Sequence, residues 1–390
     1  MSEHSYKEYI AREVAKLREG NRIRQIPPVD HGADKILLYD GRELLNLASN
    51  NYLGLAGHPA LRQGAIEAVE RYGTSSGASR LVSGNFALLD ELEREMRSFK
   101  EQEDALVVGA GFAANLMILS ALADRHTVVF SDRLNHASIV DGIRLSGAKH
   151  VRYRHNDTTH LAELLEAHAA VPRKLLVTDT VFSMDGDIAD LATLVDLCQN
   201  HGVLSVVDEA HAAGIFGNGR GLAAELGLAD RVDIHMGTFS KGFGSYGAYV
   251  AGKADIIGYL RNTGRPFVFS TALPPAVVGA SLAAVRLVRE TGTMGNRLLG
   301  MARDVREFLG SLGLDVGSSQ TAIIPVMLGS NDAALAARDA LMEYGVLVGA
   351  IRPPTVPQNT ARLRISLRAD LTDADLTLFK TAVVQMTERE

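Results

Sequence analysis

The sequence contains no tryptophan, a single cysteine and no long apolar run, and each of these absences excludes a class of protein. With Cys198 as the only cysteine among 390 residues, neither a disulfide-stabilised scaffold nor a cysteine-rich metal site is expected. No run reaches the roughly 18 apolar residues of a membrane helix. The polar residues 1–5 also lack the apolar core of a signal peptide. The sequence therefore predicts a soluble, cytoplasmic protein without a membrane partner.

The charge balance is equally moderate. The chain carries 40 Lys and Arg against 46 Asp and Glu, a formal net charge of -6, and 46% of its residues are hydrophobic. Such values are typical of a folded globular chain and exclude a disordered one. A mildly acidic chain offers no uniform basic field, so nucleic acid is not an expected partner.

From about residue 60 to 270, short apolar, β-branched runs alternate with helical stretches such as residues 88–100 and 191–201. The alternation predicts an α/β fold with a mostly parallel, seven-stranded sheet covered on both faces. The last run follows a glycine-rich turn and is the candidate antiparallel strand. The expected strands are residues 105–108, 127–130, 151–153, 174–177, 204–207, 234–237 and 248–250.

The two ends of the chain lack this regular alternation of strands and helices. A charged helix over residues 6–20 precedes a hairpin whose Asp40-Gly41 pair is a turn signal. Beyond Pro274-Pro275, helices and separated strands predict a smaller C-terminal α+β domain. We therefore expect three segments: an N-terminal arm and hairpin (1–46), a large cofactor-binding domain (47–275) and the C-terminal domain (276–390). The expected elements outside the large domain are strands 36–39 and 44–47, helices 276–289 and 301–312, and strands 322–327, 346–348 and 363–367.

Reactive side chains follow two of the expected strands directly. Asp208 and His211 follow the run at 204–207, and Lys241 follows the run at 234–237 among small residues. Ligands of open α/β sheets bind beyond the carboxyl ends of the strands. An acid, a histidine and a lysine are therefore expected to face one crevice.

This set of residues suits pyridoxal 5'-phosphate. Lys241 supplies an amine for a Schiff base, Asp208 a carboxylate for the pyridinium nitrogen, and His211 a donor to the ring hydroxyl. The phosphate needs backbone N–H groups at a helix start, which the glycine-rich residues 109–112 provide. The hydroxyls of Thr238 and Ser240 lie beside the lysine in sequence.

Other interpretations of the same residues stay open. Residues 109–114 fit G-x-G-x-x-A after a strand, and Asp132 follows at the next strand end, as in a nicotinamide-dependent oxidoreductase. That reading leaves Lys241 without a role. Taken singly, Lys241 is also consistent with a solvated surface charge and Asp208 with a helix cap. His155, His160 and His168 show no paired ligand spacing, so no metal is predicted.

The chain contains the motifs NNYLG at 50–54, GTSSGASR at 73–80, DRLNHAS at 132–138, VFSMDGD at 181–187, DEAH at 208–211 and TFSK at 238–241. These six motifs resemble those of the α-oxoamine synthase family, and the resemblance spans about residues 24–368. It implies a fold-type I pyridoxal phosphate enzyme, an acyltransferase that condenses an amino acid with an acyl thioester and releases carbon dioxide.

Three further segments are STALPP at 270–275, AIRPPTVP at 350–357 and TARLRIS at 360–366. They are similar to the branch of that family that acts in biotin biosynthesis. The resemblance implies L-alanine and a pimeloyl thioester as substrates, with coenzyme A or an acyl carrier protein both open as the carrier. Thr180 stands where the family usually has glycine, and Ile23-Arg24 where many members have Tyr-Arg. A sister activity, acetyl transfer from acetyl-CoA to glycine, is the nearest alternative.

The resemblance also implies residue roles and a homodimer with the active site at the subunit interface. His136 is expected to stack on the cofactor ring and to act in catalysis with Lys241 and Asp208, although it is equally placed to cap the following helix. Arg364 is expected to bind the amino-acid carboxylate, but Arg362 and Arg364 also fit a strand with one wet face. The other implied residues are Gly111, Phe112 and Ser183 for the cofactor, Ser270 and Thr271 for the phosphate of the partner subunit, and Arg24, Asn50 and Thr355 for the substrate.

Overall fold

A computed structural model describes residues 5–24, 26–32 and 34–388, which form two compact units. The large unit contains Asn50–Met301, and the small unit contains the described residues up to Ser49 together with those from Ala302 onward. The helix α12 (Met294–Ser311) begins in the large unit and continues into the small one.

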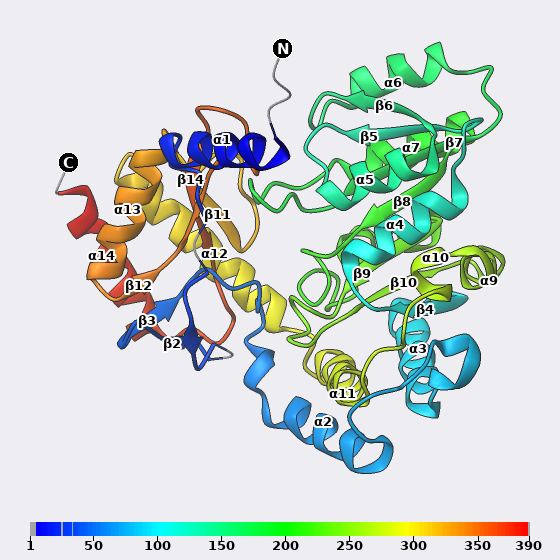
Figure 1. Cartoon of the computed structure of the whole chain (residues 1–390), viewed down its shortest axis with the longest axis horizontal. Helices are drawn as coiled ribbons and strands as arrows, with labels where there is room; N and C mark the ends of the chain where they lie inside the picture. The colour runs from blue at the N-terminus through cyan, green and yellow to red at the C-terminus, as the bar shows by residue number, and fades with distance from the viewer. Residues whose placement is uncertain (1–4, 25, 33, 389–390) are drawn as a thin grey trace. The chain divides into compact units, whose positions relative to one another are not determined.

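A seven-stranded sheet forms the centre of the large unit (Figure 1). β10 is antiparallel to both of its neighbours, and the pairings among β9, β8, β7, β5 and β6 are all parallel. The mostly parallel sheet and its antiparallel strand confirm the fold predicted from the alternating runs. In spatial order the strands are β4 (Asp104–Val108), β10 (Ala248–Gly252), β9 (Ile234–Thr238), β8 (Leu204–Asp208), β7 (Lys174–Asp179), β5 (Val128–Asp132) and β6 (Lys149–Tyr153).

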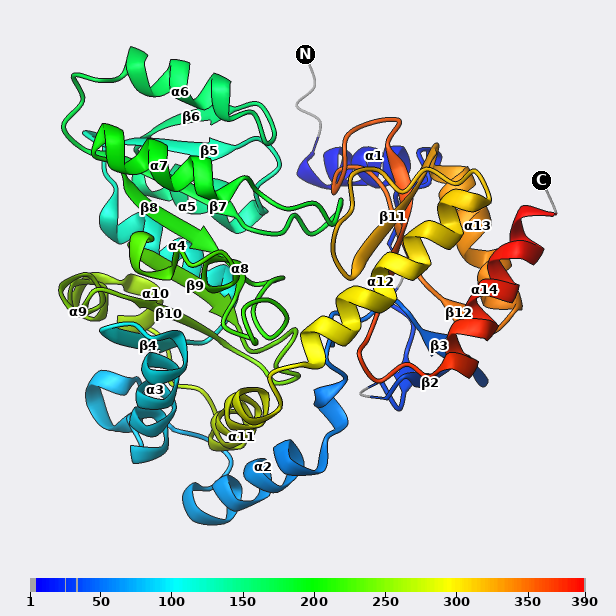
Figure 2. The same ribbon diagram turned by 180° about the vertical axis from the view of Figure 1, so that it is seen from behind.

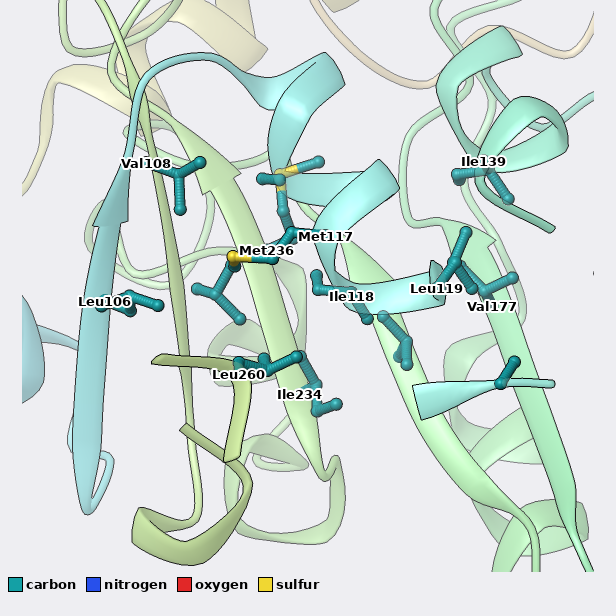
Figure 3. Packing of buried hydrophobic residues seen from close by; sticks show 14 of the residues in the cluster. Leu106, Val108, Met117, Ile118, Leu119, Ile139, Val177, Ile234, Met236 and Leu260 are labelled. Carbon is teal, nitrogen blue, oxygen red and sulfur yellow. The ribbon is translucent and has the colours of Figure 1, made fainter. Parts of the chain in front are cut away.

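Helices cover both faces of this sheet, as Figures 1 and 2 show from opposite sides. On one face, α4 (Gly111–Leu122), α5 (Ala137–Ser146), α9 (Ala254–Thr263) and α10 (Arg265–Val268) enclose the apolar core drawn in Figure 3. On the other face, α6 (Thr158–Ala167) and α7 (Leu191–His201) pack over a second cluster. Because both faces are buried, most residues of the central strands are apolar, whereas the edge strand β6 is largely polar and partly exposed. None of the described helices is both long and apolar enough to cross a lipid bilayer.

Three longer helices complete the large unit: α2 (Pro59–Tyr72), α3 (Ala87–Lys100) and α11 (Pro275–Thr291). α2 and α11 cross at Gly64 and Gly279, where a Cβ on Gly279 would lie 2.1 Å from the Gly64 carbonyl oxygen. This close approach holds α11 in the large unit, whereas the sequence placed residues 276–289 in the C-terminal domain. The other short elements are η1 (Leu55–Gly57), η2 (Arg80–Gly84), α8 (Leu222–Glu225) and η3 (Ala229–Arg231).

The small unit combines the two ends of the chain. In the predicted hairpin, Asp40 (φ 48°) and Gly41 (φ 73°) both adopt left-handed conformations, as a two-residue turn requires. Its second strand pairs in parallel with β12, so the hairpin belongs to the same unit as the C-terminal residues, not to a separate arm. The elements are α1 (Tyr6–Glu19), β1 (Val29–Asp30), β2 (Ile36–Tyr39), β3 (Arg42–Asn46), β11 (Ile323–Gly329), α13 (Asn331–Glu343), β12 (Val346–Leu347), β13 (Gly349–Ile351), β14 (Ala361–Ser366) and α14 (Asp373–Thr387).

Candidate active site

Buried polar side chains gather at the carboxyl edge of the large sheet. Thr238 ends β9, Asp208 ends β8, Asp179 ends β7 and Asp132 ends β5, and all four are buried. Since these strands run in the same direction, their carboxyl ends meet at one edge. The sheet therefore brings together residues that are up to about a hundred positions apart in the sequence.

Lys241 and His211, both expected from the sequence, are in direct contact. The Nζ atom of Lys241 lies 2.9 Å from Nε2 of His211, and Nδ1 of His211 lies 2.7 Å from the hydroxyl oxygen of Tyr52. The Tyr52 hydroxyl donates to Oδ1 of Asn50 at 3.2 Å. These contacts form a chain in which Nδ1 of His211 donates to Tyr52 and Nε2 accepts from Lys241. Tyr52 had no role in the sequence analysis, although it lies in the same motif as Asn50.

A second buried chain begins at Asp208. Its Oδ1 accepts from the backbone N–H of Ala210 at 2.9 Å, and its Oδ2 accepts from Nδ2 of Asn115 at 2.8 Å. The same Asn115 nitrogen donates to Oγ of Ser138 at 2.9 Å, and that hydroxyl lies 2.7 Å from Nδ1 of His136. Asn115 therefore links Asp208 to His136. The sequence analysis missed it, and the available signal was a lone amide in an otherwise apolar helix.

The tautomer of His136 follows from this network. Its Nδ1 accepts from the backbone N–H of Ser138 at 3.3 Å, so the ring does cap α5. Burial lowers the pKa of His136, and the positive charge of Lys241 acts in the same direction while the Asp208 carboxylate opposes both. A neutral ring whose Nδ1 accepts must carry its proton on Nε2. The cap thus leaves an N–H donor on the far side of the ring.

Asp179 and Asp208 are register partners on adjacent parallel strands. Burial, and then the negative charge of Asp208, raise the pKa of Asp179 well above its usual value. Two buried carboxylates so close together cannot both ionise easily. The backbone N–H of His136 also donates to Oδ2 of Asp179 at 2.7 Å. The Asp208 carboxylate therefore disfavours a negative charge on Asp179, and the bond from the His136 N–H lets Asp179 hold the loop before α5.

The first turn of α4 fits a phosphate group. Its N-cap, Ala110, provides no side-chain hydrogen bond to the helix amides. A Cβ on Gly111 would lie 2.6 Å from Cγ2 of Thr238, so this position requires glycine. Oγ1 of Thr238 is buried and has no hydrogen-bond partner within the described chain. A buried hydroxyl without a partner beside uncapped helix amides is what a bound phosphate would satisfy. Phe112, next to Gly111, is 45% exposed and lies edge-on to the ring of His136.

The other expected cofactor residues lie at the surface of the same unit. Ser183 is half-buried in the loop after β7, between the bridged residues Val181 and Ile188. Ser240, Ser270 and Thr271 are exposed. Thr271 forms an isolated antiparallel bridge with Ser79, which fixes the backbone of this segment.

The small unit holds the expected substrate-binding arginines. Nη2 of Arg24 donates to Oγ1 of Thr355 at 3.1 Å, so two residues 331 positions apart, both exposed, are in contact. Arg364 is 6% exposed, and its Nη1 donates to Oγ of Ser366 at 2.7 Å. The alternative of a strand with one wet face is wrong, because all six residues of β14 are buried. Arg362 is likewise 3% exposed.

Comparisons with known proteins agree with this geometry. The family described as "Aminotransferase class I and II" matches residues 42–383. The chain is 47% identical over 374 residues to a Bacillus cereus protein named "Putative 8-amino-7-oxononanoate synthase", with 95% of both chains covered. A serine palmitoyltransferase structure from Sphingomonas wittichii matches with a TM-score of 0.90 at 32% identity over 97% of both chains. An 8-amino-7-oxononanoate synthase structure from Francisella tularensis matches with a TM-score of 0.76 at 27% identity over 89% of this chain and 97% of that one.

The chain belongs to the aminotransferase class I and II family of pyridoxal phosphate enzymes, and within it to the α-oxoamine synthases. An SPT structure that contains pyridoxal phosphate has a TM-score of 0.91 to this fold. The cofactor predicted from Lys241, Asp208 and His211 is therefore confirmed. The nicotinamide alternative is wrong, because the glycine-rich turn at 109–112 belongs to a pyridoxal phosphate fold.

Proposed function

We propose that the protein condenses L-alanine with a pimeloyl thioester and releases 8-amino-7-oxononanoate, carbon dioxide and the free thiol, a step of biotin biosynthesis. The names of relatives 45–48% identical to the chain support this choice within the family. The observation that carries the chemistry is the convergence of Lys241, His211, Asp208 and His136 at one edge of the sheet.

Pyridoxal phosphate, when bound, supplies the electron sink for the charge that develops at Cα of the amino acid. Asp208 would keep the pyridine nitrogen protonated, and its side chain is held in place by hydrogen bonds from Ala210 and Asn115. His211 would face the ring hydroxyl, oriented by Tyr52. The amides of the first turn of α4 and the hydroxyl of Thr238 would hold the phosphate.

Lys241 and His136 move the protons. The amine of Lys241 would hold the cofactor covalently, and as a free amine it would take the proton from Cα of the amino acid as a general base. Cα of the substrate would attack the thioester carbonyl, and the thiolate would leave and take a proton from solvent. The amino-acid carboxyl group would then leave as carbon dioxide, and Cα would take back the proton held by Lys241. The Nε2–H of His136 donates to the thioester oxygen as negative charge develops there. The hydrogen bonds from Ser138 to Nδ1 support this assignment because they hold the proton on Nε2.

The arginines of the small unit are proposed to bind the two substrate carboxylates. Arg364 would take the carboxylate of alanine, since a guanidinium matches a carboxylate with two parallel hydrogen bonds. Arg24 would meet the distal carboxylate of the pimeloyl chain, with Thr355 beside it. Asn50 is proposed as a further substrate contact, and its bond with Tyr52 ties it to the chain that ends at Lys241.

A second candidate within the family is acyl transfer to serine from a long-chain thioester. The serine palmitoyltransferase structure favours it, because its TM-score exceeds that of the 8-amino-7-oxononanoate synthase structure. The transfer of an acetyl group to glycine is a third candidate function. The three candidates differ in the amino acid and in the acyl chain.

A steady-state assay separates these candidates. Thiol release and product mass would be measured for alanine, glycine and serine against pimeloyl, acetyl and palmitoyl thioesters of coenzyme A. The proposal expects the highest kcat/KM for alanine with the pimeloyl thioester and a product with the mass of 8-amino-7-oxononanoate. A repeat with the pimeloyl group on acyl carrier protein identifies the preferred carrier. Higher kcat/KM for serine with palmitoyl-CoA, or for glycine with acetyl-CoA, would refute the assignment.

A homodimer in the cytoplasm is part of the same proposal. The exposure of Ser270 and Thr271, on a backbone fixed by the bridge to Ser79, supports a role in contacting a second copy. Light scattering of the purified protein should give twice the mass of 41.9 kDa. A monomer that is fully active would exclude a shared active site.

A further inference from the structure

His155 lies outside the residues assigned to the reaction, just after β6, yet both of its ring nitrogens contact buried carboxylates. Nδ1 lies 3.0 Å from Oδ1 of Asp132, and Nε2 lies 2.8 Å from Oδ2 of Asp187. The histidine side chain is 21% exposed, whereas the carboxylates are 1% and 5% exposed. A ring that donates from both nitrogens is an imidazolium. Burial by itself lowers the pKa of His155, but the hydrogen bonds and charges of Asp132 and Asp187 outweigh it and raise the pKa to about 10.

The Asp132 side of this contact leads to His136. Oδ1 of Asp132 also accepts from the backbone N–H of Leu134 at 2.8 Å, and its Oδ2 accepts from the backbone N–H of Asn156 at 2.8 Å. Leu134 lies two residues before His136, so the Asp132 carboxylate fixes the backbone of the loop that carries His136. The His155 ring therefore holds this loop through a buried acceptor.

The Asp187 side leads to Ser183. Oδ2 of Asp187 also accepts from Nδ2 of Asn156 at 2.9 Å, and its carbonyl oxygen accepts from the backbone N–H of Phe182 at 3.1 Å. The ring of Phe182 stands edge-on to His155, with ring centroids 4.5 Å apart and planes at 90°. Ser183 follows Phe182 directly. The same imidazolium thus also holds the loop that carries the serine.

We propose that His155 is a positioning residue that ties the loop bearing His136 to the loop bearing Ser183 through its two ring N–H groups. The inference rests on the proposed roles of His136 and Ser183 toward the cofactor. A neutral side chain cannot replace it fully, because glutamine donates from a single nitrogen and leaves one buried carboxylate uncompensated. Loss of this link should loosen both loops and so weaken the hold on the cofactor ring.

The test compares holoenzymes of wild type, His155→Gln and His155→Ala, with His201→Gln as the matched control. His201 is the last residue of α7, and its side chain is 17% exposed. Its Nε2 lies 3.7 Å from Oε1 of Glu166, which is a much weaker contact than those of His155. The readouts are the dissociation constant of pyridoxal phosphate and the visible circular dichroism per bound cofactor, neither of which needs an acyl substrate. Thermal unfolding of the cofactor-free proteins separates local from global effects.

We expect both His155 variants to bind pyridoxal phosphate about tenfold more weakly or worse, on the scale of a charge-assisted hydrogen bond, with reduced dichroism per cofactor. The control should match the wild type. Added imidazole should restore the dichroism of His155→Ala but not of His155→Gln, whose side chain fills the space. In a His136→Ala, Ser183→Ala background, His155→Ala should change neither readout further, because the positioned groups are already absent.

Two results would overturn the proposal. The first is a lower unfolding temperature of the His155 variants with unchanged cofactor affinity and dichroism, which would make the residue purely structural. The second is a full additional loss of affinity in the His136→Ala, Ser183→Ala background. A failure of the proposed alanine and pimeloyl chemistry would alter neither outcome, since both readouts concern the cofactor alone.

Discussion

The two units hold their candidate site residues in different ways. In the large unit, Asp208 and His136 are joined through the buried Asn115 and Ser138, and the charge of Asp208 acts on the pKa of His136. In the small unit, Arg24 and Thr355 are both exposed and are joined by a single hydrogen bond. Buried electrostatic networks transmit a change in one member to the others, whereas exposed contacts are screened. Substitutions in the large unit should therefore affect the cofactor and kcat, and those of exposed residues in the small unit should affect substrate KM.

Two lysine–carboxylate pairs, one in each unit, differ in burial in the same way. In the large unit, Nζ of Lys100 lies 2.6 Å from Oε2 of Glu209, and these side chains are 1% and 0% exposed. His235 also contacts Glu209, which follows Asp208 directly in the chain. In the small unit, Nζ of Lys35 lies 2.5 Å from Oδ2 of Asp375, with side chains 30% and 14% exposed. The distances are similar, so the two pairs differ mainly in burial and in the additional partners of Glu209.

The largest effect is expected for Lys241→Ala. Without the amine, the cofactor cannot be bound covalently and Cα keeps its proton, so activity should fall by about 10²–10⁴-fold or more. The visible absorbance of lysine-bound cofactor should disappear. Lys253→Ala, at an exposed lysine after β10, is the control and should behave as the wild type. Borohydride reduction followed by peptide mapping that labelled Lys253 would contradict the assignment.

The paired lysine substitutions compare the units directly. Lys100→Met leaves the Glu209 carboxylate buried without its main cation and should destabilise the protein by about 3–5 kcal/mol. Lys35→Met removes a more exposed partner and should cost less than about 1 kcal/mol. Chemical unfolding followed by circular dichroism measures both. Equal losses would show that burial does not separate the two pairs.

Acid should remove the contribution of ionised Glu209 to the free energy of unfolding. Burial raises the pKa of this carboxyl, but the charge of Lys100 and the hydrogen bond from His235 outweigh it and lower the pKa to about 2. A depressed folded-state pKa means that the stabilisation is present above the unfolded value of about 4.5 and is lost as the pH falls toward 2. The difference in unfolding free energy between wild type and Glu209→Gln should therefore shrink from pH 6 to pH 3. A difference independent of pH would contradict an ionised Glu209.

Asp208→Asn tests the electrostatic half of the large-unit site. The substitution keeps the shape of the side chain but removes the negative charge that faces the pyridine nitrogen. The loss of such a charge-assisted hydrogen bond costs about 1.5–3 kcal/mol. We expect pyridoxal phosphate to remain bound, while exchange of the alanine Cα proton with solvent slows by about tenfold to a hundredfold. NMR measures this exchange. An unchanged exchange rate would show that another group keeps that nitrogen protonated.

The smallest expected effect on the reaction itself belongs to the small unit. Arg24→Ala should raise KM for the pimeloyl thioester about tenfold, which corresponds to ~1.4 kcal/mol, because the distal carboxylate loses its cation. KM for alanine and the visible spectrum should stay constant, and a neutral acyl thioester of similar length should be insensitive. If pimeloyl kinetics are unchanged, either another cation binds that carboxylate or the substrate has none.

Much of the fold was predictable because it depends on local patterns. The bounds of α7 match the helix expected at 191–201, and the Asp40-Gly41 turn follows from the conformational preferences of its two residues. The unit boundaries were not predictable in this way. The grouping of the hairpin with the C-terminal residues depends on the pairing of β3 with β12, about three hundred residues away. The early start of α12 at Met294 likewise lay outside the expected helix at 301–312.

The sequence by itself determined which residues follow the carboxyl ends of the parallel strands, because strand direction alone brings those ends to one edge. Lys241, His211 and Asp208 were identified on that basis. Only the tertiary structure decided how Asn115 and His155 are used, since their partners lie 23 to 93 positions away along the chain. A hydrogen bond depends on the position of two atoms to within a few tenths of an ångström. Sequence spacing does not specify that position once the partners belong to different strands and helices.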